Sequence, residues 1–330
     1  CYGIAVKEDN TITFTPGSAQ RFKLDDNSRI SLSNNDSGGD GGTDGTSGNT
    51  TFGYLSGEDI ADGGLDNSLF GHGAGKNITT GDENVAVGAE AGLGLTSSSY
   101  GTYIGYRAGK LITTGHFNTV IGREALDASA VGVNATVVIG QGAAGASGYD
   151  CDSAVVIGYG AMGTGVATSD SDGTVAIGHS VGAAITSGQR NVAVGYNTML
   201  ETTVGDSNIA IGYQALVGDG AFQNDSNIAI GSSHPTGPVL GAMGGQWSGA
   251  ASLQNVAIGT GSMAGVMNDA NNNTAVGYKS MAALTGGDSN VAVGSSAGLA
   301  LTSAENCVLL GTQAGAAIAS NGNNICIGSY

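Results

Sequence analysis

Three charged residues stand at matching places along the sequence. Glu90, Arg107 and Glu124 each lie two residues after a glycine that ends an apolar triplet. Two carboxylates held roughly 9 to 10 Å apart on one surface would suit an inverting glycosidase, which needs room for a water between them. The arginine between them favours instead a row of neutralising charges on the surface. We therefore interpret the three residues as a charge ladder and predict no catalytic site.

Aromatic residues recur directly after the same glycines. Tyrosine takes this place in six repeats and histidine in two. An exposed row of rings can stack on sugar rings, whereas in other proteins such rings pack between repeats or between chains. The two functions remain alternatives at this point. The row consists of Tyr54, His72, Tyr106, Tyr159, His179, Tyr196, Tyr213 and Tyr278.

A long insertion, at about residues 232–254, interrupts the regular pattern. It contains His234, Trp247, which is the only tryptophan of the chain, and two of the three prolines. Loops that grow out of a regular repeat are common places for binding determinants. Packing of Trp247 on a neighbouring chain is the equally weighted alternative. Trp247 and His234 are therefore candidate receptor contacts.

We predict no metal, cofactor or disulfide. None of the histidines is paired with carboxylates or cysteines at the spacing of metal ligands. The segment GGDGGTDG (38–45) resembles a calcium-binding nonapeptide but has no tandem copy, so we interpret it as part of a linker. Cys307 and Cys326 fall in neighbouring repeats about 8 Å apart, beyond the reach of a disulfide, and are expected to be small buried residues.

Composition excludes several classes of partner. The net charge is -17, which disfavours binding to nucleic acid or to an anionic membrane surface. No stretch reaches 18 consecutive apolar residues, and no signal peptide is visible at Cys1. Sixty glycines and 5% aromatic residues leave little bulk for a conventional core, so the apolar surface must be buried in another way.

That way is an internal repeat. Tetrads such as VAVG, IAIG and TAVG, often preceded by Asn, recur with spacings of 17 to 20 residues, apart from a single spacing of 28 at the insertion. The tetrads end in Gly53, Gly71, Gly88, Gly105, Gly122, Gly140, Gly158, Gly178, Gly195, Gly212, Gly231, Gly259, Gly277, Gly294, Gly311 and Gly328.

Each tetrad reads as one short strand. The residues one and three places before the glycine are mostly Ile or Val, and the residue between them is Ala in eight repeats. We expect both faces to be buried, one wide and one tight. Asn precedes the strand in eleven repeats, which predicts a ladder of stacked amides. The segment after the glycine forms either a helical turn or a second strand.

The sequence therefore predicts an all-β fold: a β-solenoid or β-roll of about sixteen coils of 17–18 residues, roughly 70 Å long at the strand spacing. The repeat domain spans 50–330, after a small β-rich segment at 1–33 and an acidic linker at 34–49. An Ile/Val face together with an Ala face exceeds what one chain can cover. We therefore expect an intertwined or side-by-side homotrimer.

These columns resemble two related families. The tetrads are similar to the head repeats of trimeric autotransporter adhesins, although the period here is longer. TYIGYRAGKLITTGHFNTVIG (102–122) resembles the repeats of bacteriophage tail fibres, and RISLSNNDSG (29–38) is similar to segments that introduce them. The resemblance covers about residues 50–330. It implies a homotrimeric fibre on a virion or cell surface that contacts other fibre or baseplate proteins and a glycan or protein receptor.

Three functions follow as alternatives. The first is a structural and adhesive fibre, either a tail-fibre shaft or a bacterial surface adhesin or filament. The second is a tailspike-like solenoid that cleaves polysaccharide, which would need convergent carboxylates on successive coils. The third, an ice-binding solenoid, would need a sustained column of threonines. We expect no such column.

Overall fold

The computed structural model is all-β and falls into two compact units, residues 1–32 and 33–330. In the first unit, β1 (Ala5–Val6) pairs antiparallel with β2 (Ile12–Thr13). The segments RFKL, RISLS and GGDGGTDG lie outside the described residues. The structure describes residues 5–6, 12–13, 48–60, 63–128, 132–168, 171–218, 223–233, 240–245, 247 and 249–329.

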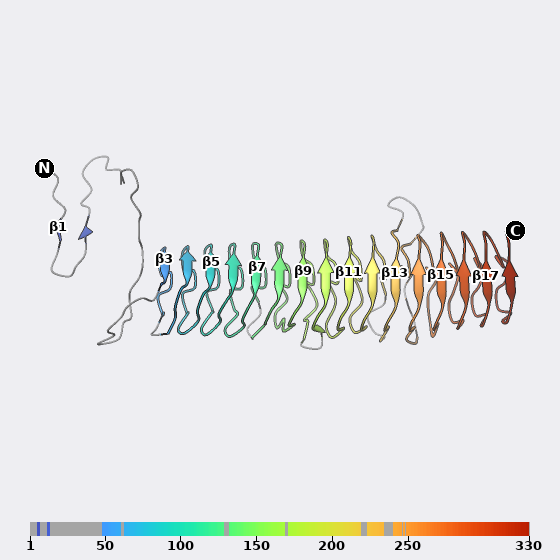
Figure 1. The fold of residues 1–330 in the computed structure, drawn as a ribbon, viewed down its shortest axis with the longest axis horizontal. Coiled ribbons are helices and arrows are strands. Elements are labelled where there is room, and N and C mark those ends of the chain that lie inside the picture. The colour runs from blue at the N-terminus through green and yellow to red at the C-terminus, as the bar shows by residue number, and fades with distance from the viewer. Residues whose placement is uncertain are drawn as a thin grey trace, which may run out of the picture. The chain divides into compact units, whose positions relative to one another are not determined.

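The second unit is a β-solenoid whose strands form one parallel sheet of sixteen, in chain order (Figure 1). Each coil contributes one strand of three residues, and no α-helix occurs in the described part of the chain. The strands are β3 (Thr50–Phe52), β4 (Ser68–Phe70), β5 (Val85–Val87), β6 (Thr102–Ile104), β7 (Thr119–Ile121), β8 (Val137–Ile139), β9 (Val155–Ile157), β10 (Val175–Ile177), β11 (Val192–Val194), β12 (Ile209–Ile211), β13 (Ile228–Ile230), β14 (Val256–Ile258), β15 (Thr274–Val276), β16 (Val291–Val293), β17 (Val308–Leu310) and β18 (Ile325–Ile327).

The strands pair in register, so like residues stack on like. Ala193 in β11 pairs with Ala210 in β12, and Val194 pairs with Ile211. The central residue of each strand from β4 to β17 points into the coil and is buried. A narrow coil favours alanine there, because a larger side chain has to share the interior with those of the turns. Tyr103 is the largest residue at this place and is fully buried.

Within a single chain only one strand face is buried, and burial of the other face, expected from the sequence, would require contact with further copies of the chain. The residues that flank the central one point outward, and Val87, Ile211 and Val293 are 37%, 38% and 41% exposed. Strand side chains alternate, so burial of the central residue turns both neighbours to the outside. Each coil therefore adds one or two apolar residues to a continuous strip, here called the outer strip: the first and third residues of β3 to β18.

After the glycine the chain forms neither of the two elements expected from the sequence. It makes successive tight turns whose backbone groups bond to the neighbouring coil. Gly57 N–H donates to Ala74 O (3.0 Å), and Asp59 N–H donates to Lys76 O (2.9 Å). Left-handed residues shape these turns, as Tyr100, Arg107 and Gly109 do with φ of 62°, 59° and 60°. Hydrogen bonds between coils therefore continue beyond the strands.

The repeat glycine is required for two reasons. Gly105 has a φ of 130°, which side-chain-bearing residues rarely adopt, and a Cβ there would lie 2.6 Å from Gly122 O of the next coil. Its N–H donates to Val87 O of the preceding coil at 2.8 Å. The close stacking of coils thus excludes a side chain at this position.

The asparagine ladder is confirmed. Asn273 Nδ2 donates to Asn255 Oδ1 (3.1 Å) and to Gly287 O (2.7 Å). Its own Oδ1 accepts from Asn290 N–H and Nδ2, both at 3.0 Å. The amide is fully buried, and these bonds satisfy its polar atoms.

Two further ladders were not expected from the sequence. At the second place before the asparagine, side chains of successive coils accept from the backbone of the preceding one, as Asp225 Oδ1 does from Asp206 N–H at 2.8 Å. Threonines at one place of the turn also stack, in short runs that other residues interrupt. Thr79 Oγ1 donates to Thr96 O (3.0 Å), and Thr96 Oγ1 donates to Thr113 O (2.9 Å). These hydroxyl groups donate to carbonyl oxygens of the next coil, so their protons are not available to bind an ordered array of water.

The insertion starts after Ser233. Ser233 N–H donates to Tyr213 O (2.9 Å) and Ala242 N–H to Gly231 O (3.3 Å), which are the bonds that two consecutive residues make in an uninterrupted coil. Most of the extra residues therefore lie between these two positions. Within the described ranges, no helix is long and apolar enough to cross a membrane.

We predict that Gly105→Ala destabilises the solenoid far more than Gly142→Ala. Gly142 has a φ of 61° and no atom within 4 Å of a built Cβ. The cost at Gly142 should be about 1 kcal/mol, whereas strain plus the clash at Gly105 should cost about 3 kcal/mol or more. Chemical denaturation of both variants measures the difference, and equal midpoints would contradict the stacking argument.

We predict that Asn273→Ala lowers the free energy of unfolding by about 2–4 kcal/mol, because it leaves buried groups of Asn290 and Gly287 without a partner. Asn273→Thr should cost less. Thr174 holds the corresponding place in another coil, and its hydroxyl makes the bond within the coil, to Gly188 O at 3.2 Å. Urea titration of both variants tests the order, and a larger loss for the threonine variant would refute it.

Candidate binding groove

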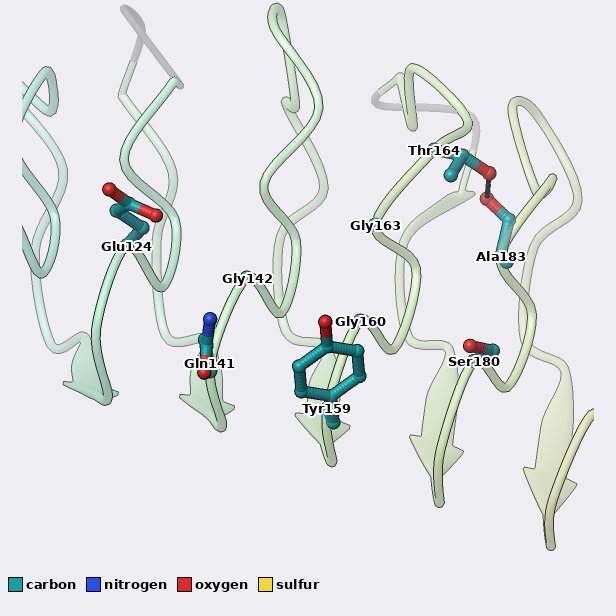
Figure 2. Close-up of a pocket in the computed structure, with 9 residues that line it drawn as sticks. All are labelled: Glu124, Gln141, Gly142, Tyr159, Gly160, Gly163, Thr164, Ser180 and Ala183. Atoms are coloured by element: carbon teal, nitrogen blue, oxygen red, sulfur yellow. Dashed lines mark hydrogen bonds between the residues drawn. The ribbon is translucent and has the colours of Figure 1, made fainter.

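A hollow of about 280 Å³ lies on the segments that leave strands β7 to β10 (Figure 2). It is near the lower end of the roughly 300–1,000 Å³ typical of small-ligand sites. None of its lining residues belongs to a strand, and Figure 2 shows the strands behind it. The lining residues are Glu124, Gln141, Gly142, Tyr159, Gly160, Gly163, Thr164, Ser180 and Ala183.

Two missing side chains create this hollow. Two places after the repeat glycine, most coils carry a side chain in the left-handed conformation, as Glu124 (φ 55°) and Ser180 (φ 49°) do. Gly142 and Gly160 take this place in the two coils between them. A built Cβ meets nothing within 4 Å at Gly142 and meets its nearest atom at 3.9 Å at Gly160. Glu124 and Ser180 thus border a gap two coils wide.

Polar groups and one ring complete the groove. Tyr159 is 56% exposed and stands beside the glycine floor. Thr164 Oγ1 donates to Ala183 O at 2.6 Å, so its lone pairs remain to accept a hydrogen bond. The Glu124 carboxylate pairs with the Arg123 guanidinium at 3.0 Å, and Arg123 does not line the groove. The lining therefore offers an aromatic face, an amide, hydroxyls and one carboxylate.

Tyr159 begins a row of stacked rings. Its centroid lies 5.1 Å from that of His179, which lies 4.8 Å from Tyr196. Tyr196 and Tyr213 follow at 5.5 Å. The preceding coil has Gln141 at this place, so Tyr159 has no ring neighbour on the side of the groove. The expected aromatic column thus exists over four successive coils.

Other aromatic residues pair locally. Tyr54 and His72 lie 5.6 Å apart, and the Tyr106 ring lies 4.9 Å from the Arg107 guanidinium carbon. Tyr278 lies 5.4 Å from Lys279 Nζ. The stacked pair Tyr100 and Phe117, 4.9 Å apart, belongs to a different column that the sequence analysis missed. Its residues stand directly before the asparagine position, where the backbone is left-handed.

The predicted charge ladder forms between Glu90 and Arg107, whereas Glu124 pairs with Arg123. Glu90 Oε2 lies 2.9 Å from Arg107 Nε and 2.8 Å from Lys110 Nζ. Hydrogen bonding from Lys110 and then from Arg107 lowers the pKa of Glu90 against the opposing effect of burial. A carboxylate held by two cations stays deprotonated at neutral pH, so Glu90 has no proton to supply as a general acid.

Trp247 lies in the interior of its coil and is 1% exposed. It follows Met243 by four residues, as the buried Met267 follows Met263. A receptor contact would require its side chain to leave the core, so this geometry does not support the proposed contact. His234, the other candidate of the insertion, lies outside the described residues.

No cluster of three metal-ligating side chains occurs in the part of the chain that the structure describes. His116 Nδ1 instead accepts a hydrogen bond from Ser99 N–H at 3.1 Å. Cys151 and Cys307 are buried free thiols and Cys326 is half-buried. Burial raises the pKa of Cys151 to about 12, which keeps this thiol protonated and unreactive.

A second, larger hollow of about 470 Å³ is the open end of the described coil stack. Ile318 and Cys326 line it, at places that the next coil covers elsewhere in the solenoid. We therefore do not treat it as a site.

The sequence carries a signal for the groove. The strands β8 and β9 are followed by GQG and GYG, so a second glycine stands two places after the repeat glycine in two consecutive coils. Tyr159 was identified as a candidate, but Gln141 and Ser180 were not. Spacing along the sequence alone does not show that Gly142 and Gly160 lie side by side and leave a gap.

Comparison with known proteins gives no assignment: no family model matches the chain, and no curated protein is significantly similar to it.

We predict that Glu90→Gln causes a small loss of stability at pH 7. The folded-state pKa of Glu90 is lowered, so its contribution is present above the unfolded-state pKa and is lost as the pH falls through the folded-state value, below 4.5. Denaturation midpoints should therefore differ at pH 7 and converge as the pH falls below the folded-state pKa of Glu90. Glu201→Gln, at an exposed glutamate, is the control. A gap that persists in acid would contradict this account.

Proposed function

We propose that this chain is a structural and adhesive fibre protein, the shaft of a bacteriophage tail fibre that takes part in attachment to the host surface. It acts on a virion or cell surface as a homotrimer, and other fibre or baseplate proteins are its partners. A bacterial surface adhesin or extracellular filament is the alternative. The repeat pattern supports the proposal, because it resembles those fibres over about residues 50–330.

The outer strip is the single observation on which the proposal of a trimer rests. Sixteen coils place apolar residues outward along one sheet face, including Phe52, Phe70, Ile104 and Ile258, which are 38–62% exposed. At the strand spacing this strip extends for roughly 70 Å, and soluble proteins rarely leave so long an apolar patch uncovered. Copies of the same chain have the same coil spacing, so their strips match rung by rung.

The fibre proposal has a mechanical rationale. Each coil bonds to the next through strands, turns and side-chain ladders, as with Gly71 N–H to Phe52 O (2.8 Å) and Gly73 N–H to Tyr54 O (2.8 Å). Such a stack is stiff along its axis, because each coil is held by the coils on both sides of it. A stiff rod is the form that a shaft needs to hold a binding surface away from its base.

A polysaccharide-cleaving solenoid has less support. Glu90 is held by Arg107 and Lys110, and Glu124 pairs with Arg123. Neither carboxylate is arranged as one of a catalytic pair that shares an open cleft. We propose no catalytic role.

We predict that Val293→Asp dissociates the particle and that Leu299→Asp does not. Both residues are similarly exposed, at 41% and 37%, but only Val293 lies on the outer strip. A carboxylate buried between strips would lack a partner and cost several kcal/mol in each copy.

Light scattering of the native protein measures the outcome. The unchanged chain and Leu299→Asp should give about three times 32.2 kDa, and Val293→Asp a smaller mass. A monomeric unchanged chain would refute the proposal, as would the same mass for both variants.

A further inference from the structure

We propose that the groove beside Tyr159 binds a sugar residue of a neutral or amine-bearing glycan that lies across the coils after β8 and β9. The inference rests on the proposed function, since it names the class of surface molecule that such a fibre would contact. It concerns the shaft itself and not a separate tip.

The ring of Tyr159 supplies the stacking face. The residue is 56% exposed, and the ring of His179 in the next coil lies 5.1 Å from it. The flat faces of pyranose rings carry C–H groups, which pack on the negative face of an aromatic ring. A ring already held by a stack loses little freedom when a ligand covers it. Tyr159 is therefore a prepared platform at the end of the row.

The floor allows a sugar to approach closely. Gly142, Gly160 and Gly163 expose backbone in place of side chains, and the hollow of about 280 Å³ has room for a small ring. At Tyr196, by contrast, the next position carries Asn197. The other exposed tyrosines of the column also present a ring, but no hollow adjoins them. Tyr159 differs from them because its exposed ring stands next to the hollow.

Polar groups around the floor match hydroxyl chemistry. The Gln141 amide both donates and accepts, and the Ser180 and Thr164 hydroxyls add acceptors on the far side (Figure 2). Among the described residues, neither the Gln141 nor the Ser180 side chain forms a hydrogen bond within the protein. A few placed polar groups beside an apolar face are the usual composition of small-ligand sites.

Charge decides between classes of sugar. The lining contains no Lys, Arg or His, and it contains the Glu124 carboxylate. The chain carries a net charge of -17, which repels anions at long range. Uronic and sialic acids would bring a carboxylate toward Glu124 with no cation in the lining to receive it. Neutral and amine-bearing sugars meet no such penalty.

The test is a printed array of glycans in three charge classes, probed with the native full-length particle. The neutral class holds glucose, galactose, mannose and N-acetylglucosamine oligomers, the amine-bearing class holds glucosamine oligomers, and the acidic class holds galacturonic and sialic acid oligomers. Calorimetry on the best binder then measures affinity. We expect Tyr159→Ala to weaken binding by at least about fivefold, the scale of one aromatic contact.

Matched controls separate the groove from the column and from folding. Tyr278→Ala removes an exposed ring from the same column in a coil outside the groove and should leave affinity unchanged. Gly142→Asn fills the hollow at a left-handed position that asparagine tolerates, and should abolish binding. Gly73→Asn makes the same change at the same position of a coil outside the groove and should not.

Binding in the neutral or amine-bearing class that is lost in Tyr159→Ala and Gly142→Asn, with both controls intact, supports the proposal. No binding in these classes, a preference for acidic glycans, or equal effects at Tyr159 and Tyr278 overturns it. Particle mass from light scattering is read on the same samples. A trimer that binds no glycan sinks this inference alone, whereas a monomer that binds through Tyr159 sinks the trimeric fibre alone.

Discussion

The hydrogen bonds between coils govern the rest of this structure. Parallel strands must lie about 4.8 Å apart to pair, and the chain returns to the same place every 17 or 18 residues to meet that spacing. Whatever stands at one position of a coil therefore has its own counterpart directly above and below. Groups that tolerate stacking on themselves are kept: glycine where the backbones nearly touch, asparagine where amides pair, and small apolar residues in the interior.

The same constraint explains how the chain accommodates strained backbone. Left-handed residues occur at several places in each coil, including Leu126 (φ 47°) and Met199 (φ 51°). Each costs about 1 kcal/mol or more relative to an ordinary conformation. They persist because their N–H groups bond to a neighbouring coil, as with Leu126 N–H to Ala143 O of the next coil at 2.9 Å and Arg107 N–H to Ala89 O of the preceding coil at 3.0 Å. Stacking determines the turns, and local preference contributes less.

The sequence predicts what is periodic and loses what depends on direction. The strand, the repeat glycine and the asparagine ladder follow from spacing, because one kind of residue predominates in each of these columns. Which strand face points inward does not follow from alternation alone, so the sequence does not show that the Ala face fills the coil and the Ile/Val face lies outside it. The turns were also missed, since left-handed Met, Glu or Arg carries no sequence signal. Trp247 marked an insertion correctly, but its burial depends on a coil position that the extra residues obscure. The groove at Gly142 and Gly160 required knowing that these positions adjoin.

The proposed functions assign separate tasks to two surfaces of the solenoid. The outer strip calls for copies of the same chain, and the groove beside Tyr159 remains a surface feature of the segments that follow the strands. Cryo-electron microscopy of the native particle tests the central claim most directly, because it shows which surfaces meet. The account predicts a threefold rod with the outer residues of β3 to β18 buried between copies and the Tyr159 groove open to solvent. A particle in which the outer strip faces solvent, as a single chain or as copies joined elsewhere, would contradict it.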